Sequence, residues 1–325
     1  MPLNHPRSPL VRPPLVAILG PTASGKTALS LRLARTFPIE IVNADSRSFY
    51  RGMDIGTAKV SRADREAVPH HLIDILDPGE PMSLATFQDL AMELIARIHG
   101  RGYAPLLAGG TAQYVNAVIE GWTIPRVPPN EPFRQQLERD AATDGVESVA
   151  ERLRRVDPES ADRSGRNLRR IIRALEIHAA TGEPMSVLRG KRPVPFDPLQ
   201  IELWLPRDML HERIARRTRQ MMRDGLVEEV RSLLAGGVPA TAPAFSAIGY
   251  RQVLPLIDGR ATEAEVISQI ETDSHRLIRH QQTWFRKNSR LIRIDASVDG
   301  WEDRVEHLVR SHCATWLTSD HALGM

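Results

Sequence analysis

The fold is decided by one octet, Gly20-Pro21-Thr22-Ala23-Ser24-Gly25-Lys26-Thr27, which spells a phosphate-binding loop of the form G-x-x-x-x-G-K-[ST]. An apolar run at residues 15–19 precedes the octet and a helical pattern at residues 28–34 follows it, as a strand-loop-helix unit requires. Glycines allow a tight turn whose N–H groups point at phosphate oxygens, and the helix adds its positive N-terminal dipole. We therefore expect the octet to hold a diphosphate or triphosphate; a glycine-rich turn without a ligand is the alternative.

Two side chains of the octet have predicted roles. Lys26 is expected to neutralise terminal phosphate charge. Thr27 offers a hydroxyl to Mg²⁺, which is usually bound by one or two protein oxygens together with substrate phosphates. Mg²⁺ is therefore the expected cofactor. None of the histidines shows a metal-binding spacing with a nearby carboxylate, so no structural metal is expected.

Length and composition indicate an intracellular globular protein. The 325 residues exceed what one hydrophobic core usually serves, which favours two domains or one domain with a large insertion. No stretch approaches the roughly 18 uninterrupted apolar residues of a transmembrane helix, and the first residues lack a secretory apolar segment. The single cysteine, Cys313, excludes an intramolecular disulfide and a cysteine-based zinc site. We expect a cytoplasmic protein, and we take a monomer as the working assumption.

Basic residues gather in two zones although the net charge is only +3. Residues 151–192 hold eleven lysines and arginines against six acids, and residues 273–293 hold six against one. Almost all of the basic residues are arginines. Such zones suit a polyanionic partner such as nucleic acid, whose phosphates dominate binding. A solvated helix face is the alternative that charge alone leaves open.

The first third of the chain predicts an α/β fold. Strands expected at residues 15–19, 39–44 and 104–108 alternate with helical patterns, which indicates a parallel sheet flanked by helices. Ligands of such sheets lie beyond the carboxyl ends of the strands. Polar or glycine residues follow each of these three strands at the octet, at Asp45-Ser46 and at Gly109-Gly110-Thr111. We expect these three loops to face one crevice of a P-loop NTPase-like core.

A mainly helical insertion interrupts this core. Prolines cluster at residues 125–132 and again at 193–198, as expected of linkers, and the intervening segment is helical with its best pattern at residues 167–180. Further elements are expected at residues 201–205 (strand), 207–235 and 262–287 (helices), 291–294 (strand) and 301–317 (helix). The predicted domains are a disordered tail (1–14), a catalytic core (15–119 and 196–325) and a helical insertion (120–195).

Four residues outside the octet are candidates for chemistry. Asp45 follows the second strand, where a carboxylate close to bound phosphates serves as a base or a metal partner, with a helix N-cap as the alternative. Thr111 is predicted to hydrogen-bond the reacting group or to cap a helix. Arg213 and Arg217 lie four apart on one helix face and are predicted to close over a diphosphate and stabilise leaving-group charge. Simple surface exposure is the alternative for these arginines.

Longer stretches resemble one known family. The octet together with residues 45–59, DSRSFYRGMDIGTAK, closely resembles the bacterial tRNA dimethylallyltransferase family. Further matches are Gly109-Gly110-Thr111 with Tyr114, and the segments RIIRALE (170–176), IGYR (248–251) and QQTWFR (281–286). The resemblance spans roughly residues 15–295.

The resemblance implies a reaction and roles for the candidates. It implies transfer of a dimethylallyl group from dimethylallyl diphosphate to N6 of adenosine 37 in the anticodon loop of tRNA, so that the octet holds a prenyl diphosphate rather than ATP. By resemblance Asp45 is the general base and Thr111 orients it or the amine, with the octet, Lys26 and Mg²⁺ at Thr27 receiving charge on the departing diphosphate. Arg213 is assigned to diphosphate binding and Arg217 to catalysis. The target adenine must leave the loop stack to reach such a site.

The resemblance also implies the tRNA contacts, which fall largely in the two basic zones. Single-stranded RNA loops are recognised by arginines, aromatic stacking and base-edge contacts, which makes Tyr250, Trp284 and Phe285 stacking candidates. A position in the hydrophobic core is the alternative for Trp284 and Phe285. The implied contacts are Asp45, Ser46, Arg47, Ser48, Thr111, Arg134, Arg169, Arg170, Ile171, Ile172, Arg173, Ser246, Gly249, Tyr250, Arg251, Arg279, Gln281, Thr283, Trp284 and Arg286.

This chain departs from the family pattern at three places. Ser48 stands where many relatives have Gln, Arg166-Asn167 replaces a frequent Asn-Asp pair, and His280 replaces a usual Arg. Two other functions stay open from the residues alone. One is a small-molecule P-loop kinase in which Asp45 accepts a hydroxyl proton while ATP occupies the loop. The other is a non-catalytic RNA-binding protein that keeps the loop for structure.

Overall fold

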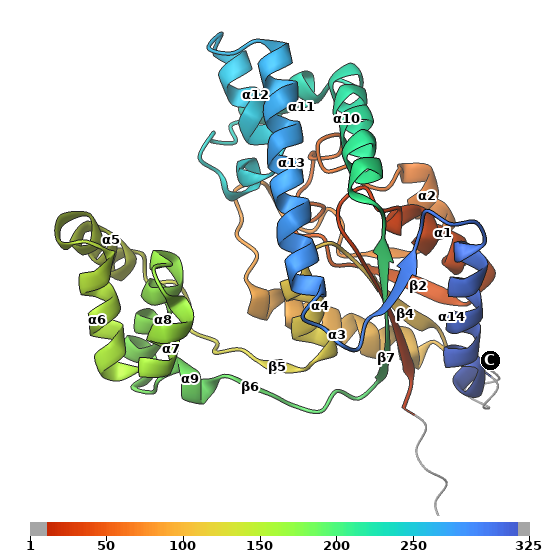
Figure 1. The fold of residues 1–325 in the computed structure, drawn as a ribbon, viewed down its shortest axis with the longest axis horizontal. Helices are drawn as coiled ribbons and strands as arrows, with labels where there is room; N and C mark the ends of the chain where they lie inside the picture. The colour runs from red at the N-terminus through yellow and green to blue at the C-terminus, as the bar shows by residue number, and fades with distance from the viewer. Residues whose placement is uncertain (1–11, 318–325) are drawn as a thin grey trace, which may run out of the picture. The chain divides into compact units, whose positions relative to one another are not determined.

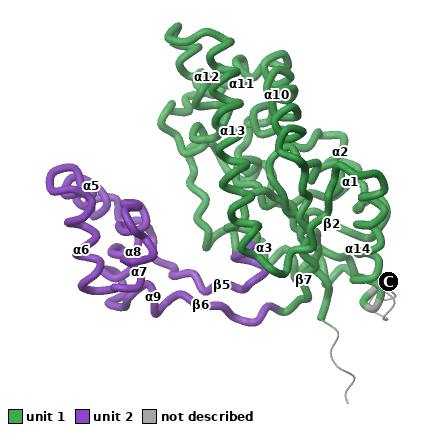
Figure 2. The backbone as a smooth tube through the Cα atoms, viewed as in Figure 1, with its two compact units in different colours: residues 1–115, 195–325 green, residues 116–194 purple. Residues whose placement is uncertain are grey.

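The chain forms two compact units. A computed structural model describes residues 12–317 of the protein. Within this range the first unit consists of the residues up to 115 and from 195 onward, and the second of residues 116–194 (Figure 2). The sequence prediction placed the insertion at residues 120–195. Residues 1–11 of the predicted tail lie outside the described residues, and the prediction is wrong at Pro14, where the first strand begins.

The first unit is built on a six-stranded sheet whose order is β3-β2-β4-β1-β7-β8 and whose neighbouring strands are all parallel. The predicted α/β fold class is therefore confirmed. The short edge strand β3 was not predicted, because two residues carry no periodic signal. The strands are β1 (Pro14–Leu19), β2 (Ile39–Asn43), β3 (His70–His71), β4 (Ala104–Ala108), β7 (Asp197–Trp204) and β8 (Ile292–Asp295).

Helices cover both faces of this sheet, as a buried parallel sheet requires (Figure 1). Val16 and Ile18 of β1 belong to one apolar cluster with Leu33 of α1 and Val305 and Val309 of α14. Figure 1 shows α1 and α14 on one side of the sheet and α3 on the other. The helices of this unit are α1 (Lys26–Thr36), α2 (Arg62–Ala67), α3 (Leu84–Gly100), α10 (Arg207–Arg223), α11 (Leu226–Ala235), α12 (Tyr250–Ile257), α13 (Glu263–Phe285) and α14 (Trp301–Leu317), with a 3-10 turn η1 (Pro243–Ser246).

The long helix expected at residues 207–235 is wrong, because two helices occupy this segment. Asp224 ends α10, and Gly225 follows with a φ of +97°, in the left-handed region that glycine adopts without strain. Helix α11 then packs with α12 and part of α13 around buried Tyr50 and Tyr250. Among residues 12–317, no helix is both long enough and apolar enough to cross a membrane.

The second unit is a small helical bundle. Its core contains Leu137, Val149, Leu153, Ile171 and Leu175, which come from three helices. The helix predicted at residues 167–180 is confirmed as α8, in which Ile171, Ile172 and Leu175 are buried. The elements are α5 (Glu131–Asp144), α6 (Val146–Val156), α7 (Pro158–Ser164), α8 (Leu168–Thr181), α9 (Met185–Leu188) and the strands β5 (Trp122–Thr123) and β6 (Gly190–Lys191); α4 (Ala112–Ile119) crosses the boundary between the units.

Candidate functional site

The phosphate-loop octet adopts a backbone that requires its glycines. Gly20 has a φ of +147°, and a Cβ built on it would lie 2.7 Å from the carbonyl oxygen of Leu203. Gly25 has a φ of +102° and occupies the N-cap position of α1, where no side chain hydrogen-bonds to the first N–H groups of the helix. The N-terminus of α1 therefore opens directly onto the loop, as an anion-binding loop requires.

Lys26 folds back onto this loop. Its Nζ donates to the carbonyl oxygens of Gly20 at 2.9 Å and Pro21 at 2.7 Å. Burial lowers the pKa of Lys26 from 10.5 to about 8; Asp45 opposes this shift and Arg217 adds to it. The lowered pKa shows that nearby negative charge does not offset the cost of burying the ammonium group. A phosphate anion bound here would supply that negative charge and would itself be stabilised.

Two arginines of α10 reach the same loop, as predicted. Nη1 of Arg213 donates to the carbonyl oxygen of Ala23 at 3.3 Å, and Nη1 of Arg217 donates to Oγ1 of Thr22 at 3.2 Å. Burial lowers the pKa of Arg217, and the nearby Asp45 carboxylate opposes this effect. Simple surface exposure is therefore wrong for this pair, although their neighbour Arg216 is exposed.

Asp45 lies beside these cations in a tight turn that Asn43 holds. Oδ1 of Asn43 accepts from the Asp45 N–H, and Nδ2 of Asn43 donates to the Asp45 carbonyl, both at 3.1 Å. Oδ1 of Asp45 accepts from the Arg47 N–H at 3.0 Å. Because a turn rather than a helix follows, the N-cap alternative for Asp45 is wrong. Within residues 12–317, Oδ2 of Asp45 has no hydrogen-bond donor, so it remains available to a substrate.

Thr111 connects the end of β4 to this turn. Its Oγ1 accepts from the Ser46 N–H at 3.5 Å, while its carbonyl accepts from the Tyr114 N–H at the start of α4. A Cβ on Gly109 would lie 2.4 Å from the Ala44 carbonyl oxygen, so the two strand ends touch. The structure thus brings the octet, Asp45 and Thr111 to one edge of the sheet.

The predicted tRNA contacts of the first unit divide into exposed and buried residues. Arg279 and Thr283 lie exposed on α13, and Arg286 is exposed directly after its last residue. Neither arginine pairs with a carboxylate in the described part of the chain. Nη1 of Arg47 donates to Oγ of Ser246 at 2.9 Å, and Ser246 is exposed. The side chains of Arg279, Thr283, Arg286 and Ser246 are therefore accessible to solvent.

Other predicted contacts of this unit are corrected. Tyr250 is fully buried with its hydroxyl donating to Glu229, so it cannot stack on a base. Gly249 is buried beside it, and Ser48 is only 8% exposed. The pKa of Tyr250 is raised by burial and by the carboxylate of Glu229, so the phenol stays protonated.

Three further predicted contacts of this unit face inward or are paired. Arg251 is exposed but its Nη2 pairs with buried Asp273 at 2.8 Å. Trp284 is half-buried. Gln281 is only 7% exposed and its amide binds two loops of the core, so the predicted tRNA contact through this side chain is wrong.

The predicted tRNA contacts of the second unit also divide into exposed and buried residues. Arg169 and Arg170 are exposed on α8, and no carboxylate in the described residues pairs with them. Ile171 and Ile172 are buried in the helical core, so their side chains cannot contact RNA. Asn167 caps α8 by accepting from the Arg170 N–H at 3.2 Å, which gives this family departure a structural role.

Glu176 neutralises the remaining arginines of this unit. Nε of Arg134 donates to the 1% exposed Glu176 carboxylate at 2.8 Å, and Arg173 also pairs with it. Burial alone would raise the pKa of Glu176, but hydrogen bonds from Arg134, Arg173 and the Asn130 N–H outweigh it and hold the pKa at about 2. Arg134 and Arg173 are therefore structural cations, only about 30% exposed.

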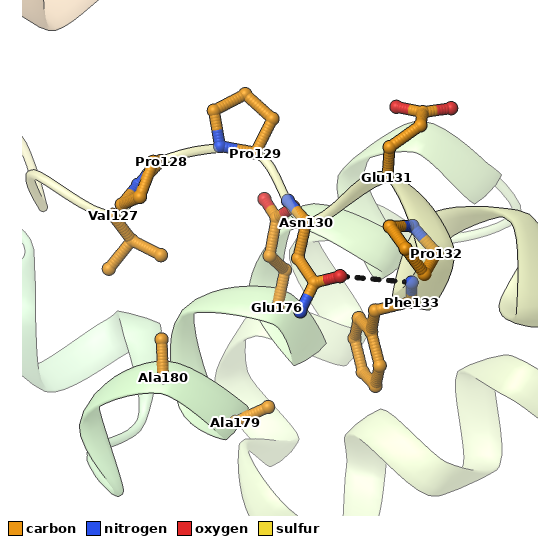
Figure 3. A pocket seen from close by; sticks show the side chains of 10 residues that line it. All are labelled: Val127, Pro128, Pro129, Asn130, Glu131, Pro132, Phe133, Glu176, Ala179 and Ala180. Carbon is orange, nitrogen blue, oxygen red and sulfur yellow. Dashed lines mark hydrogen bonds between the residues drawn. The ribbon is translucent and has the colours of Figure 1, made fainter.

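A pocket of about 550 Å³ lies beside Glu176 (Figure 3). Its wall contains no lysine, arginine or hydroxyl side chain, so it offers no cation to a phosphate group. The lining residues are Val127, Pro128, Pro129, Asn130, Glu131, Pro132, Phe133, Glu176, Ala179 and Ala180.

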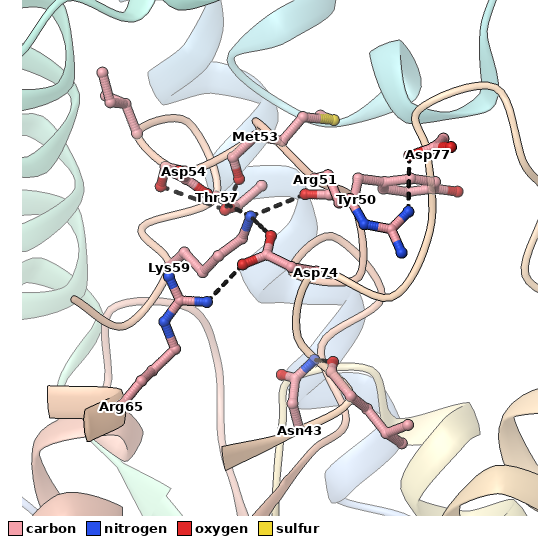
Figure 4. Close-up of polar contacts among 12 residues, drawn as sticks. Asn43, Tyr50, Arg51, Met53, Asp54, Thr57, Lys59, Arg65, Asp74 and Asp77 are labelled. Carbon is pink, nitrogen blue, oxygen red and sulfur yellow. Dashed lines mark hydrogen bonds and ion pairs between the residues drawn. The ribbon is translucent and has the colours of Figure 1, made fainter. Parts of the chain in front are cut away.

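Sequence reasoning missed the residues that hold the segment after Asp45. Lys59 is 1% exposed; its Nζ donates to the carbonyl oxygen of Tyr50 at 2.9 Å and pairs with Asp54 and Asp74 (Figure 4). Glu229 accepts from the N–H groups of Asp54 and Ile55, both at 2.9 Å. Lys59 belongs to the stretch that carries the family resemblance, and its partners lie within 15 residues of it. Glu229 lies 175 residues from Asp54 and 174 from Ile55, and no spacing signals it.

Comparison with known proteins identifies the family of this site. The model of the IPP transferase family matches residues 48–288. The protein named tRNA dimethylallyltransferase from Roseiflexus castenholzii is 49% identical over 298 residues, which cover 91% of this chain and 97% of the relative. Its namesake from Thermomicrobium roseum is 47% identical over 318 residues, which cover 96% and 97%.

Solved structures give the same result. The tRNA isopentenylpyrophosphate transferase of Bacillus halodurans is 40% identical with a TM-score of 0.68, and the match covers 95% of this chain and 98% of that one. A eukaryotic dimethylallyltransferase shares the fold at 22% identity with a TM-score of 0.74, over 96% of this chain and 86% of that one.

Proposed function

The chain belongs to the IPP transferase family, and from this premise we propose that it transfers the dimethylallyl group of dimethylallyl diphosphate to N6 of adenosine 37 in tRNA. The products are N6-dimethylallyladenosine and diphosphate. One observation carries the proposal: the phosphate loop, two arginines and the open carboxylate oxygen of Asp45 lie at one edge of the sheet.

The loop and its cations receive the donor. The diphosphate lies against N–H groups of the octet other than those of Thr22 and Ser24, which donate to Gln281 and Pro21. It displaces Lys26 from the carbonyl oxygens of Gly20 and Pro21 and accepts hydrogen bonds from Arg213 and Arg217. As the bond between C1 of the dimethylallyl group and the diphosphate oxygen breaks, its electron pair leaves with the diphosphate. Partly buried cations stabilise that charge far better than solvated ones would.

Thr27 is the proposed Mg²⁺ ligand. Its side chain is exposed at the first turn of α1, and residues 12–317 contain no cluster of three or more His, Cys, Asp or Glu side chains that could hold a metal. One hydroxyl together with phosphate oxygens and waters suits Mg²⁺, which keeps much of its hydration. When bound, the ion supplies further positive charge to the diphosphate oxygens.

Asp45 handles the acceptor. The N6 amino group of adenine is a weak nucleophile because its lone pair is delocalised into the ring. As the new bond between N6 and C1 forms, Oδ2 of Asp45 takes a proton from N6. Thr111 holds the turn that orients this carboxylate through its hydrogen bond with the Ser46 N–H.

The exposed arginines bind the RNA. Arg279 and Arg286 in the first unit and Arg169 and Arg170 in the second contact phosphates, which position the anticodon loop without reading its sequence. The protein is proposed to act as a monomer in the cytoplasm, where the buried thiol of Cys313 stays reduced. Light scattering tests the oligomeric state.

Diphosphate release tests the reaction. The protein is mixed with Mg²⁺, dimethylallyl diphosphate and a tRNA transcript that carries either adenosine or guanosine at position 37. Diphosphate should appear only with the adenosine transcript, because guanosine offers no N6 amine. Equal release from both transcripts, or release without tRNA, contradicts the proposal. Release of phosphate from ATP with transfer to another acceptor would instead indicate a kinase.

A further inference from the structure

Gln281 faces away from the RNA-accessible side of α13. Its neighbours Arg279 and Thr283 are exposed, whereas Gln281 is 7% exposed and points into the core unit. Oε1 accepts from the Thr22 N–H at 3.0 Å, and Nε2 donates to the Gly110 carbonyl oxygen at 2.9 Å. One amide therefore connects two loops that lie 259 and 171 residues from it in the chain.

The second loop is shaped to receive this side chain. A Cβ on Gly110 would lie 2.5 Å from Nε2 of Gln281, closer than real Cβ atoms approach other atoms. Glycine at residue 110 leaves room for the amide in this position, so the contact depends on both Gly110 and Gln281.

Each end of the amide lies beside one half of the proposed site. Thr22 belongs to the diphosphate loop, and its Oγ1 accepts from Arg217 at 3.2 Å. Gly110 precedes Thr111, whose Oγ1 accepts from the Ser46 N–H next to Asp45. Gln281 bonds to both loops at once.

We infer that Gln281 is a positioning residue that fixes the spacing between the diphosphate loop and the turn that carries Asp45, and that it does not contact tRNA. The inference rests on the proposed function. Bond formation requires the donor carbon and the acceptor amine at near-attack distance, so a small shift between the two loops costs rate rather than substrate binding.

Gln281→Met tests this inference, because methionine fills a similar volume without hydrogen bonds. We expect kcat for tRNA prenylation to fall about 10- to 100-fold. The Kd for tRNA should stay within about twofold, since the side chain does not face the RNA. Gln282→Met on the next, half-buried position is the matched control and should keep kcat.

Gly110→Ala perturbs the same contact from the other side. Its Cβ should displace the Gln281 amide and lower kcat to a similar extent. The double variant should be no slower than the slower single variant, because both changes break one contact. A purely structural role would lower the unfolding temperature but leave kcat unchanged well below it, and that result would overturn the inference.

Hydrogen exchange gives a readout that needs no activity. In Gln281→Met, exchange at the Thr22 amide should accelerate at least about tenfold, while exchange in residues 131–177 stays unchanged.

If Gln281→Met does not fold, Gln281→Glu replaces it as the test variant. Glutamate keeps the acceptor for the Thr22 N–H but brings a carboxylate oxygen, which cannot donate, against the Gly110 carbonyl oxygen. An unchanged kcat with weaker tRNA binding, or unchanged Thr22 exchange, overturns the inference. Wild-type protein that releases no diphosphate defeats the proposed function but leaves the exchange prediction standing.

Discussion

Asp45→Asn isolates the proposed base without disturbing its turn. Asparagine keeps an Oδ1 acceptor for the Arg47 N–H, which lies 3.0 Å away, and nearly the same volume. The variant loses only the basic Oδ2 and the negative charge near Lys26 and Arg217. A general base contributes about 10²- to 10⁴-fold, so kcat should fall by that factor, or about 3–5 kcal/mol in activation free energy.

The same charge change should affect donor binding in the opposite direction. Removing a carboxylate beside two cations leaves more positive charge for the diphosphate, so the Kd of a non-reactive diphosphate analogue should stay unchanged or decrease. Single-turnover prenylation and calorimetric titration measure the two effects. Asp77→Asn is the control, since Asp77 is exposed and its surface ion pair with Arg51 contributes little. A kcat within tenfold of wild type, or donor binding lost together with kcat, would refute the assignment of Asp45 as base.

The other predictions concern leaving-group stabilisation, stability and metal. Arg217→Met should lower kcat/KM for the donor about 10²-fold because it removes a partly buried cation, whereas exposed Arg216→Met should stay within about twofold; steady-state kinetics checks both. Glu176→Gln should destabilise the second unit by about 2–3 kcal/mol at neutral pH. The pKa of Glu176 is about 2 in the folded protein against 4.5 for the free group, so its contribution to stability is full above pH 4.5 and disappears as the pH falls toward 2. Hydrogen exchange of residues 131–177 measures this: the exchange rates of the variant and the wild type should differ at neutral pH and converge at acid pH. Tyr250→Phe should lower the free energy of unfolding by about 1–2 kcal/mol in denaturant titration, because it removes the hydrogen bond to Glu229. The Kd for tRNA in filter binding should stay unchanged, whereas a stacking role would predict weaker binding. Chelation of Mg²⁺ should abolish diphosphate release and added Mg²⁺ should restore it.

The sheet and the loop of the octet were predictable because their signals are local. The strands before the octet and before Asp45 are short apolar runs. The rule that ligands lie beyond the ends of parallel strands predicts that Asp45 and Thr111 lie near the loop. The spacing of Arg213 and Arg217 placed both on one helix face, and the structure shows both reaching the loop.

The failures share one physical cause, which is that spacing does not identify a distant partner. Arg134 carries a charge in the sequence, but Glu176, 42 residues away, neutralises it. Tyr250 has the chemistry to stack on a base, but Glu229 and Gly56 enclose it. Gln281 lies between exposed residues in a basic segment, and only the fold shows that its side chain points the other way.

Nucleoside mass spectrometry of tRNA tests the central claim most directly. Unmodified tRNA is incubated with the protein, Mg²⁺, dimethylallyl diphosphate and an equal concentration of ATP, then digested, and the fragment that contains position 37 is analysed. We predict adenosine 37 with one dimethylallyl group on N6 and no phosphorylated product. Phosphate transferred from ATP, with adenosine 37 unchanged, would contradict the assignment of the phosphate loop to a prenyl diphosphate.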